Sequence, residues 1–267
     1  MAYEHTPVSV TGKRAVVIGG TSGIGRAIAL GFAAENADVI ATSRDATRVA
    51  NVTDEIRETG AETTEITCDV AERASVEALC EAAVEAFGGV DVLVNSFGGA
   101  ARQSVLDVPE DEWGRVMNTQ LSGIYRATQV FAREMIGENG GEANGKPGGS
   151  IVEIGSLSTS LAIPELAAYT TAKGGLEAFT RVAARDCAPA RVNAVRPGFT
   201  ETPLTAETYA EGTHRHERIA ERTAVGRLAW PEEIVGAAIY LASDAASYTT
   251  GECITIDGGF AAGAFEE

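Results

Sequence analysis

Short runs rich in valine and isoleucine alternate with helix-like stretches along the chain, and this alternation constrains the fold more than any other feature. Seven runs occur, at residues 14–19, 38–42, 63–68, 91–95, 150–155, 191–196 and 253–257. Strands that alternate with helices form a parallel sheet. Nearly continuous apolar runs, such as residues 15–18, are typical of strands that helices bury on both faces. The pattern predicts an α/β fold, a doubly wound parallel sheet of seven strands with helices on both faces.

One stretch shows the expected helical spacing most clearly. Between the third and fourth runs, six apolar residues recur at intervals of three and four, which puts them on one side of a helix. They are Val76, Leu79, Cys80, Ala83, Val84 and Phe87. We expect this amphipathic helix to cover one face of the sheet.

The length and composition indicate a single globular domain. The chain has 267 residues, of which 45% are hydrophobic, and this suits one large α/β core better than two smaller ones. We expect residues 1–267 to form that domain, with residues 1–11 as a tail and the Gly-rich residues 137–149 as a surface loop. No apolar run nears the roughly 20 residues of a membrane span, and residues 1–11 do not resemble a signal peptide. A cytoplasmic protein is predicted.

The charge and the metal-binding residue types restrict the partners further. Acidic residues number 38 against 21 basic ones, of which only three are lysines, so the formal net charge is −17. So acidic a surface repels phosphate backbones, and we expect neither nucleic acid nor anionic membrane as a partner. The lysine shortage fits a halophilic surface, and an ordinary acidic cytosolic protein is the alternative. Four dispersed cysteines and three histidines give no metal-site spacing, so no metal is expected.

A glycine-rich turn follows the first predicted strand directly and leads into a helix-like stretch. Such a turn lets backbone amides approach a pyrophosphate at the positive end of the helix. Because it stands at the first strand-to-helix junction of a βαβ series, it predicts a dinucleotide site on a Rossmann-type fold. The candidate cofactor-binding residues of this turn are Gly19, Thr21, Ser22, Gly23, Ile24 and Gly25.

The end of the second predicted strand bears on the choice of cofactor. An acid there would hold the ribose 2′-hydroxyl of NAD, whereas an arginine accommodates the 2′-phosphate of NADP. The chain has Ser43 and Arg44 at this point, so NADP is favoured and NAD stays possible. The alternative is that Arg44 is a solvated loop residue and that Asp45 caps the next helix.

Three side chains form a candidate catalytic site. Tyr169 and Lys173 are four residues apart, which puts them on one face of a helix. A phenol with a pKa of about 10 is a weak acid or base at neutral pH, and a nearby ammonium lowers that pKa. Ser156 follows the fifth run, at the sheet edge where open α/β folds bind ligands. We expect Tyr169 to transfer a proton and Ser156 to hold a substrate oxygen.

With these motifs in this order, the chain closely resembles the short-chain dehydrogenase/reductase family from about residue 12 to residue 260. Further matches are Asp69, Val70, Asn95, Pro197, Gly198, Thr202 and the sequence Asp257-Gly258-Gly259. The resemblance implies that Tyr169 is the general acid/base, that Ser156 orients the substrate oxygen, and that Lys173 binds the nicotinamide ribose and lowers the pKa of Tyr169. It also implies that Asp69 and Val70 flank the adenine. Asn95 would lie next to the nicotinamide ribose, and Thr202 would meet the carboxamide.

The chain departs from the family pattern at three places. Ile18 replaces the threonine that begins the glycine loop, and Ser96-Phe97 replaces the usual Asn-Ala after Asn95. Gln120 stands where the family carries a catalytic asparagine, while Asn118 lies two positions earlier. Gln120 is therefore a candidate fourth catalytic residue, and the alternative is that it only packs beneath the site.

The resemblance predicts reversible hydride transfer between NAD(P) and a secondary alcohol or ketone. Residues 102–113 and 222–236 are similar to those of sugar-acid and polyol dehydrogenases, such as gluconate dehydrogenases. The net charge of −17 offers no obvious basic platform for an anionic acyl carrier, so a small polyhydroxylated substrate is expected; the alternative is that Arg102, Arg215, Arg218 and Arg222 form a local platform. A 3-oxoacyl thioester (carrier-protein or CoA) reductase is the alternative, and a non-catalytic NADP-binding regulator is a third possibility. Family members commonly pair the helices that correspond to residues 112–135 and 166–188, which implies a homotetramer or homodimer.

Overall fold

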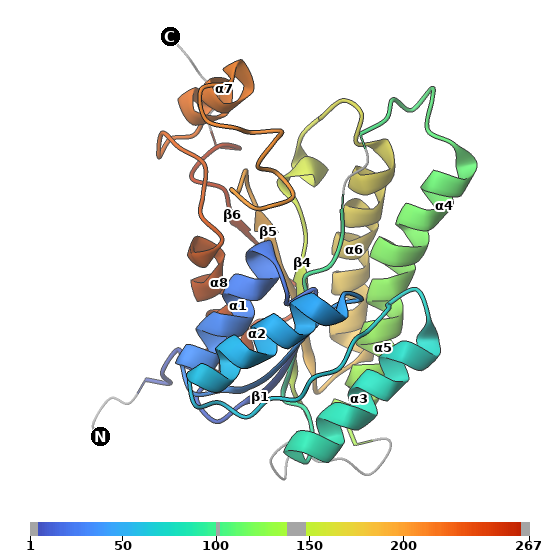
Figure 1. Cartoon of the computed structure of the whole chain (residues 1–267), viewed down its shortest axis with the longest axis vertical. Coiled ribbons are helices and arrows are strands. Elements are labelled where there is room, and N and C mark those ends of the chain that lie inside the picture. Colours follow the sequence, from blue (N-terminus) through green and yellow to red (C-terminus); the bar gives the residue numbers. More distant parts are fainter. Residues whose placement is uncertain (1–4, 100–101, 138–147, 263–267) are drawn as a thin grey trace.

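The computed structural model describes residues 5–99, 102–137 and 148–262 (Figure 1). In these residues six strands form one parallel sheet in the order β2-β1-β3-β4-β5-β6. The strands are β1 (Arg14–Ile18), β2 (Asp38–Thr42), β3 (Val92–Asn95), β4 (Ser150–Ile154), β5 (Arg191–Pro197) and β6 (Cys253–Ile256). The predicted doubly wound α/β fold is confirmed.

Helices cover both faces of this sheet, as Figure 1 shows. In chain order they are α1 (Gly23–Ala34), α2 (Ala46–Glu58), α3 (Arg73–Phe87), α4 (Glu110–Met117), α5 (Gly123–Met135), α6 (Ala167–Asp186), α7 (His214–Arg222) and α8 (Glu232–Ala242). One apolar cluster joins the sheet to α1, α2 and α8 through residues such as Phe32, Ile56 and Leu241. A second joins the opposite face to α3, α5 and α6 through residues such as Leu79 and Phe131. Burying both faces explains why the strands are apolar almost throughout.

The helix expected between the third and fourth runs is α3. Val76, Leu79, Cys80 and Ala83 are its buried residues, and they belong to the predicted apolar stripe. The helix ends where Gly88 adopts a left-handed conformation with φ of 75°, which a residue without Cβ tolerates best. The three-to-four spacing therefore placed this helix and its buried side correctly.

The third predicted strand is not formed, which corrects the expected number of strands. Residues 63–68 run beside the edge strand β2, but backbone hydrogen bonds tie them to it only at the two ends of this stretch. The Val39 amide donates to the Glu62 carbonyl at 3.0 Å, and the Cys68 amide donates to the Ser43 carbonyl at 3.0 Å. Several side chains between them are polar and only partly buried, so little apolar surface holds this edge as a regular strand.

Other expectations need smaller adjustments. The helix expected over residues 112–135 is divided between α4 and α5 by a π-helical turn, Asn118–Ser122. Val10 is fully buried, so the end of the expected tail packs on the domain. The expected loop at 137–149 lies largely outside the described residues, which omit 138–147. Within the described ranges, no helix is both long and apolar enough to cross a membrane.

The segment between β5 and α8 lies over the carboxyl ends of the strands and includes α7 (Figure 1). A small apolar cluster of Leu157, Ile219, Leu228 and Phe260 holds it there, with Phe199 and Tyr209 packed against the cluster. The ring of Phe199 lies 4.8 Å from that of Phe260 and 5.5 Å from that of Tyr209, between centroids. This segment forms one wall of the site described next.

Candidate active site

A cleft of about 600 Å³ opens at the carboxyl ends of the strands. Its walls come from the glycine loop after β1, residues 96–99 after β3, residues 154–158 after β4, residues 197–205 after β5, and α6. Loops that follow neighbouring parallel strands meet at one edge of the sheet, which is where open α/β folds bind ligands. Residues far apart in the sequence are thereby brought together.

The glycine loop turns so tightly that side chains would not fit at two of its positions. Gly19 has φ of +80°, and a Cβ there would lie 2.6 Å from the Ser96 carbonyl oxygen. A Cβ on Gly25 would lie 2.1 Å from the Gly19 carbonyl oxygen. The chain can therefore fold back against the residues after β3 only because these positions are glycines.

The start of α1 fits an anionic ligand. Ser22 is the N-cap residue, but its side chain makes no capping hydrogen bond, so it leaves the first amides of the helix without a side-chain partner. The residues from Ser22 to Gly25 line the cleft together with Pro197, Gly198 and Thr202. A Cβ on Gly23 would lie 3.3 Å from Thr202, so the loop and Thr202 approach closely. A helix N-terminus open to a cleft is suited to a pyrophosphate.

The residues that favour NADP over NAD follow β2 directly. Thr21 Oγ1 donates to Ser43 Oγ at 2.9 Å, which joins the glycine loop to this strand end. Asp45 is the N-cap of α2 and accepts from the Arg48 amide at 3.1 Å, so it caps the helix as the alternative expected. Arg44 is exposed, whereas Arg48 lines the cleft. Arg48 was not among the residues predicted from the sequence, although its position four residues after Arg44 is a usable signal.

The three candidate catalytic side chains line the cleft together. Ser156 lies two residues after β4 and caps the short 3-10 turn Leu157–Ser160, where its Oγ accepts from the Ser158 amide at 3.2 Å. Tyr169 and Lys173 are one turn apart on α6. Lys173 Nζ lies 5.9 Å from the centroid of the Tyr169 ring and donates to the Ile154 carbonyl at 2.7 Å. A phenol, a hydroxyl and an ammonium therefore meet at one wall.

Burial dominates the acidities of this group. It raises the pKa of Tyr169, while the hydrogen bond with Ser156 acts in the opposite direction. Burial lowers the pKa of Lys173 to about 8, and the negative charge of Glu153 opposes that change. The expectation that the ammonium lowers the pKa of Tyr169 therefore requires that Lys173 stays charged in a site that disfavours its charge.

Gln120 lies in the π-helical turn and is 3% exposed. Its Nε2 donates to the Gly99 carbonyl at 2.5 Å, and its Oε1 is buried without a partner. A Cβ on Gly98 would lie 2.8 Å from that oxygen, so Gln120 packs beneath the loop that lines the cleft. Asn118 is exposed instead, and its Oδ1 accepts from Arg126 at 2.7 Å. Participation of Gln120 in catalysis stays a prediction.

The residues expected around the adenine and the ribose lie beside or below the cleft. Asp69 Oδ1 accepts from the Ala71 amide at 3.0 Å. Val70 is 5% exposed and packs close to Gly123. Asn95 is fully buried, and its Nδ2 donates to Glu153 Oε1 at 3.2 Å. In this arrangement Asn95 supports the floor of the site.

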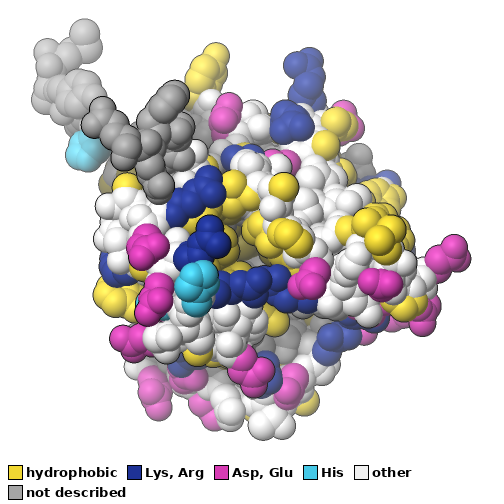
Figure 2. Space-filling model, turned by 90° about the horizontal axis from the view of Figure 1, so that it is seen from above, with side chains coloured by type: hydrophobic (Ala, Val, Ile, Leu, Met, Phe, Trp, Pro, Cys, Tyr) yellow, Lys and Arg dark blue, Asp and Glu magenta, His cyan; other side chains and the backbone are white. Residues whose placement is uncertain are grey.

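The other end of the cleft contains residues that sequence analysis did not assign to the site. They are Phe199, Leu204, Thr208 and Tyr209 from the segment over the strands. Arg102 also lines the cleft, whereas Arg215, Arg218 and Arg222, which the sequence suggests with it as a basic platform for an acyl carrier, do not. Arg102 lies 4.0 Å from Glu165. Figure 2 shows the molecule from the top of the view in Figure 1. Lys and Arg side chains gather near the middle of the face seen there, among apolar and acidic side chains (Figure 2).

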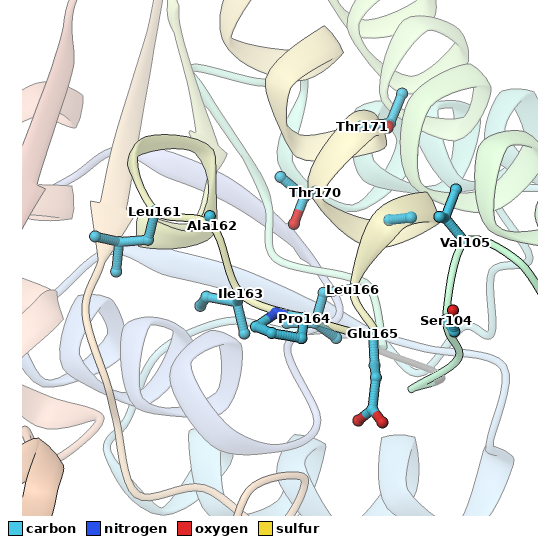
Figure 3. A pocket seen from close by; sticks show the side chains of 11 residues that line it. Ser104, Val105, Leu161, Ala162, Ile163, Pro164, Glu165, Leu166, Thr170 and Thr171 are labelled. Atoms are coloured by element: carbon cyan, nitrogen blue, oxygen red, sulfur yellow. The ribbon is translucent and has the colours of Figure 1, made fainter.

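A second groove, of about 610 Å³, lies next to this cleft. Figure 3 shows it between residues 161–166 and the segment that carries Ser104 and Val105. It shares Ile163 and Leu166 with the cleft, but its lining includes none of the three candidate catalytic residues. Among the described residues no group of three or more His, Cys, Asp or Glu could hold a metal ion.

Comparison with known proteins identifies the family. A family model described as enoyl-(acyl carrier protein) reductase matches residues 18–261. The 3-oxoacyl-(acyl-carrier-protein) reductase FabG of Salmonella typhimurium is 35% identical over 254 residues, which cover 94% of this chain and 98% of that protein. The chain belongs to the short-chain dehydrogenase/reductase family. It is thus an oxidoreductase that acts on CH–OH groups with NAD or NADP.

Solved structures of short-chain dehydrogenases agree with the observed fold. A short-chain type dehydrogenase/reductase from Mycobacterium marinum has 32% sequence identity and a TM-score of 0.86, over 95% of this chain and 97% of that one. A gluconate 5-dehydrogenase from Burkholderia cenocepacia, solved in complex with NADP and tartrate, has 29% identity and a TM-score of 0.88, over 96% and 98%. The relatives thus include enzymes named for two different substrate classes.

Proposed function

We propose that this short-chain dehydrogenase uses NADP to interconvert a secondary alcohol and a ketone in a sugar, a sugar acid or a polyol. The observation that carries the proposal is the cleft itself, in which Arg102 lies in the same cavity as Ser156 and Tyr169. An arginine suits a carboxylate because it can donate two parallel hydrogen bonds. The gluconate 5-dehydrogenase complex supports this choice, since tartrate is a small hydroxy acid.

The residues of the cleft would divide the reaction between them. The nicotinamide cofactor supplies the hydride chemistry when it is bound. In the reductive direction, Tyr169 gives its phenolic proton to the substrate oxygen, and the Ser156 hydroxyl donates a hydrogen bond to the same oxygen. Lys173 keeps a positive charge near the phenol, which favours its deprotonated form. Exchange of Tyr169 for Phe should abolish turnover and leave cofactor binding intact.

The preference for NADP would depend on Arg44 and Arg48. Ser43, which lies between the glycine loop and α2, takes the place of the acid that would favour NAD. We expect Arg44→Ala and Arg48→Ala each to weaken NADP binding by about 1.5–3 kcal/mol, the value for hydrogen bonds to charged groups. NAD binding should change little, because NAD lacks the 2′-phosphate. Titration of both cofactors by fluorescence tests this assignment, and equal losses for the two cofactors would refute it.

The second candidate function is reduction of a 3-oxoacyl thioester. It is favoured by the FabG relative and by a group of arginines that suits an anionic acyl carrier, Arg102 in the cleft and Arg215, Arg218 and Arg222 exposed on α7. A net charge of −17 disfavours it, because acyl carriers are anionic. A screen of sugars, sugar acids and 3-oxoacyl thioesters with both cofactors in molar KCl separates the two substrate classes. A protein that binds NADP and reduces no carbonyl in this panel would be a non-catalytic regulator.

We further propose a cytoplasmic, halophilic homotetramer or homodimer. Tyr125 on α5 and Val182 on α6 are 45% and 58% exposed, and such apolar side chains suit a helix interface between copies. Light scattering at assay salt that finds a monomer would contradict the oligomer.

If the acidic surface needs screening, the melting temperature should rise from low to molar salt. An unchanged melting temperature would contradict a halophilic surface.

A further inference from the structure

A carboxyl group is buried one residue before the carbonyl to which Lys173 donates. Glu153 lies on β4 and is 0% exposed. It precedes Ile154, whose carbonyl oxygen accepts the hydrogen bond from Lys173 Nζ at 2.7 Å. Glutamate is almost never fully buried in proteins unless it is paired, so this carboxyl group calls for a partner.

Neutral groups hold only one of its two oxygens. Oε1 accepts from Thr128 Oγ1 on α5 at 2.9 Å and from Asn95 Nδ2 at the end of β3 at 3.2 Å. Oε2 is buried and has no hydrogen-bond partner. On β5 the residue in register with Glu153 is Ala194, which offers no charge. Two donated hydrogen bonds favour the ionised carboxylate, yet they do not balance its charge.

The positive charge that acts on Glu153 is that of Lys173, on α6. Lys173 is 4% exposed and uses one of its three N–H donors on Ile154. Burial raises the pKa of Glu153 to about 7 and lowers that of Lys173 to about 8, and in each case the charge of the other residue opposes the effect of burial. In the described part of the chain, Glu153 is the acid whose charge acts on Lys173.

Among the described residues, other titratable groups near the pair include Tyr169, Glu177 and Cys187, which lie on α6 or at its end. The Tyr169 ring lies 5.9 Å from Lys173 Nζ. Burial, Asp186 and the charge of Glu153 together raise the pKa of the Cys187 thiol, which keeps Cys187 neutral. Tyr169 and Cys187 are not anions near neutral pH, and the Glu177 carboxylate is already paired with Arg196 at 2.7 Å. None of these groups can therefore replace the Glu153 carboxylate as a partner for the ammonium.

We propose that Glu153 is the buried counter-ion of Lys173 and keeps its ammonium charged beneath the cleft. Glu153 is then a positioning residue, because it acts through Lys173 and does not line the cleft. The charged lysine favours the deprotonated phenol of Tyr169. Without Glu153, Lys173 would lose its proton at a lower pH, so Tyr169 would have a cationic neighbour over a narrower pH range, with the loss at the alkaline end.

The chain suits a direct measurement on Lys173, because it contains only three lysines, Lys13, Lys146 and Lys173. Lysine labelled with 13C at Cε gives three NMR signals that can be assigned by exchanging Lys13 and Lys146 for Arg. We expect the variant Glu153→Gln, which keeps the shape of the side chain, to lower the pH at which Lys173 titrates by about one to three units. Unchanged titration would overturn the proposal.

Glu177→Gln is the matched control. Glu177 lies on α6 one turn after Lys173, but its carboxylate is already paired with Arg196 at 2.7 Å. The same substitution there should change the titration of Lys173 much less than Glu153→Gln does. Equal shifts in the two variants would also overturn the proposal, because they would show that any nearby substitution perturbs the lysine.

The reciprocal variant covers the case in which Glu153→Gln does not fold. Because coupling between two sites acts in both directions, Lys173→Met should raise the pH at which Glu153 takes up its proton. The infrared carbonyl band of a buried protonated carboxylic acid reports that step, and its absence in Glu153→Gln, where that variant is obtained, assigns the band. An identical protonation pH with and without Lys173 would refute the pairing. None of these measurements uses a substrate, so they stand or fall independently of the proposed function.

Discussion

The glycine loop allows a quantitative prediction from the substitution Gly25→Ala. The added Cβ would lie 2.1 Å from the Gly19 carbonyl oxygen and 3.0 Å from Ser96 Oγ. Carbon and oxygen attract best at a separation of about 3.5 Å, so the loop would have to move by at least about 1 Å. Overpacking of this kind costs about 1–3 kcal/mol of stability. A displacement of about 1 Å at a site that positions the reactants also lowers the rate about 100-fold.

The matched control is Gly236→Ala, an exposed glycine inside α8. A Cβ there would meet no atom within 4 Å. Alanine in a helix interior is favoured over glycine by about 0.5–1 kcal/mol, so this variant should be stabilised. Urea unfolding in molar salt measures the two changes in stability, which should have opposite signs, and fluorescence titration measures NADP affinity. If Gly25→Ala matched the wild type in stability, NADP affinity and rate, the inferred close contact would be refuted.

Two further predictions follow from side-chain contacts. If Gln120 serves in catalysis, Gln120→Ala should lower kcat markedly, whereas Gln120→Asn should preserve or raise it, and neither variant should change NADP affinity. Full activity in Gln120→Ala would leave Ser156, Tyr169 and Lys173 as the catalytic set. Burial disfavours the charge of Glu177, but hydrogen bonds from Arg196 and Thr159 outweigh it and hold its pKa below the ordinary 4.5. A lowered pKa contributes stability that is present above the unfolded-state pKa and lost as the pH falls, so acid should destabilise the wild type more than Glu177→Gln. Parallel curves of unfolding free energy against pH would contradict this.

Much of the architecture could be predicted because the signals are local. Runs of Val and Ile, the three-to-four spacing in α3 and the glycines after β1 each act through residues close in the sequence. The four-residue interval between Tyr169 and Lys173 is likewise a property of one helix. The prediction of a strand at residues 63–68 was wrong because such a strand depends on pairing along β2 at the sheet edge, and tertiary pairing overrides local propensity.

The sequence by itself determined a parallel α/β sheet, a glycine turn for a nucleotide and one helix face with a phenol and an amine. Only the tertiary structure placed Arg48 and Arg102 in the cleft, joined Gln120 to the Gly99 carbonyl, and buried both Glu153 and Lys173. The physical reason is that burial and contact between residues 20 or more positions apart are set by how strands and helices stack. The alternation of apolar and polar residues does not indicate which residue will be the partner of a buried carboxylate.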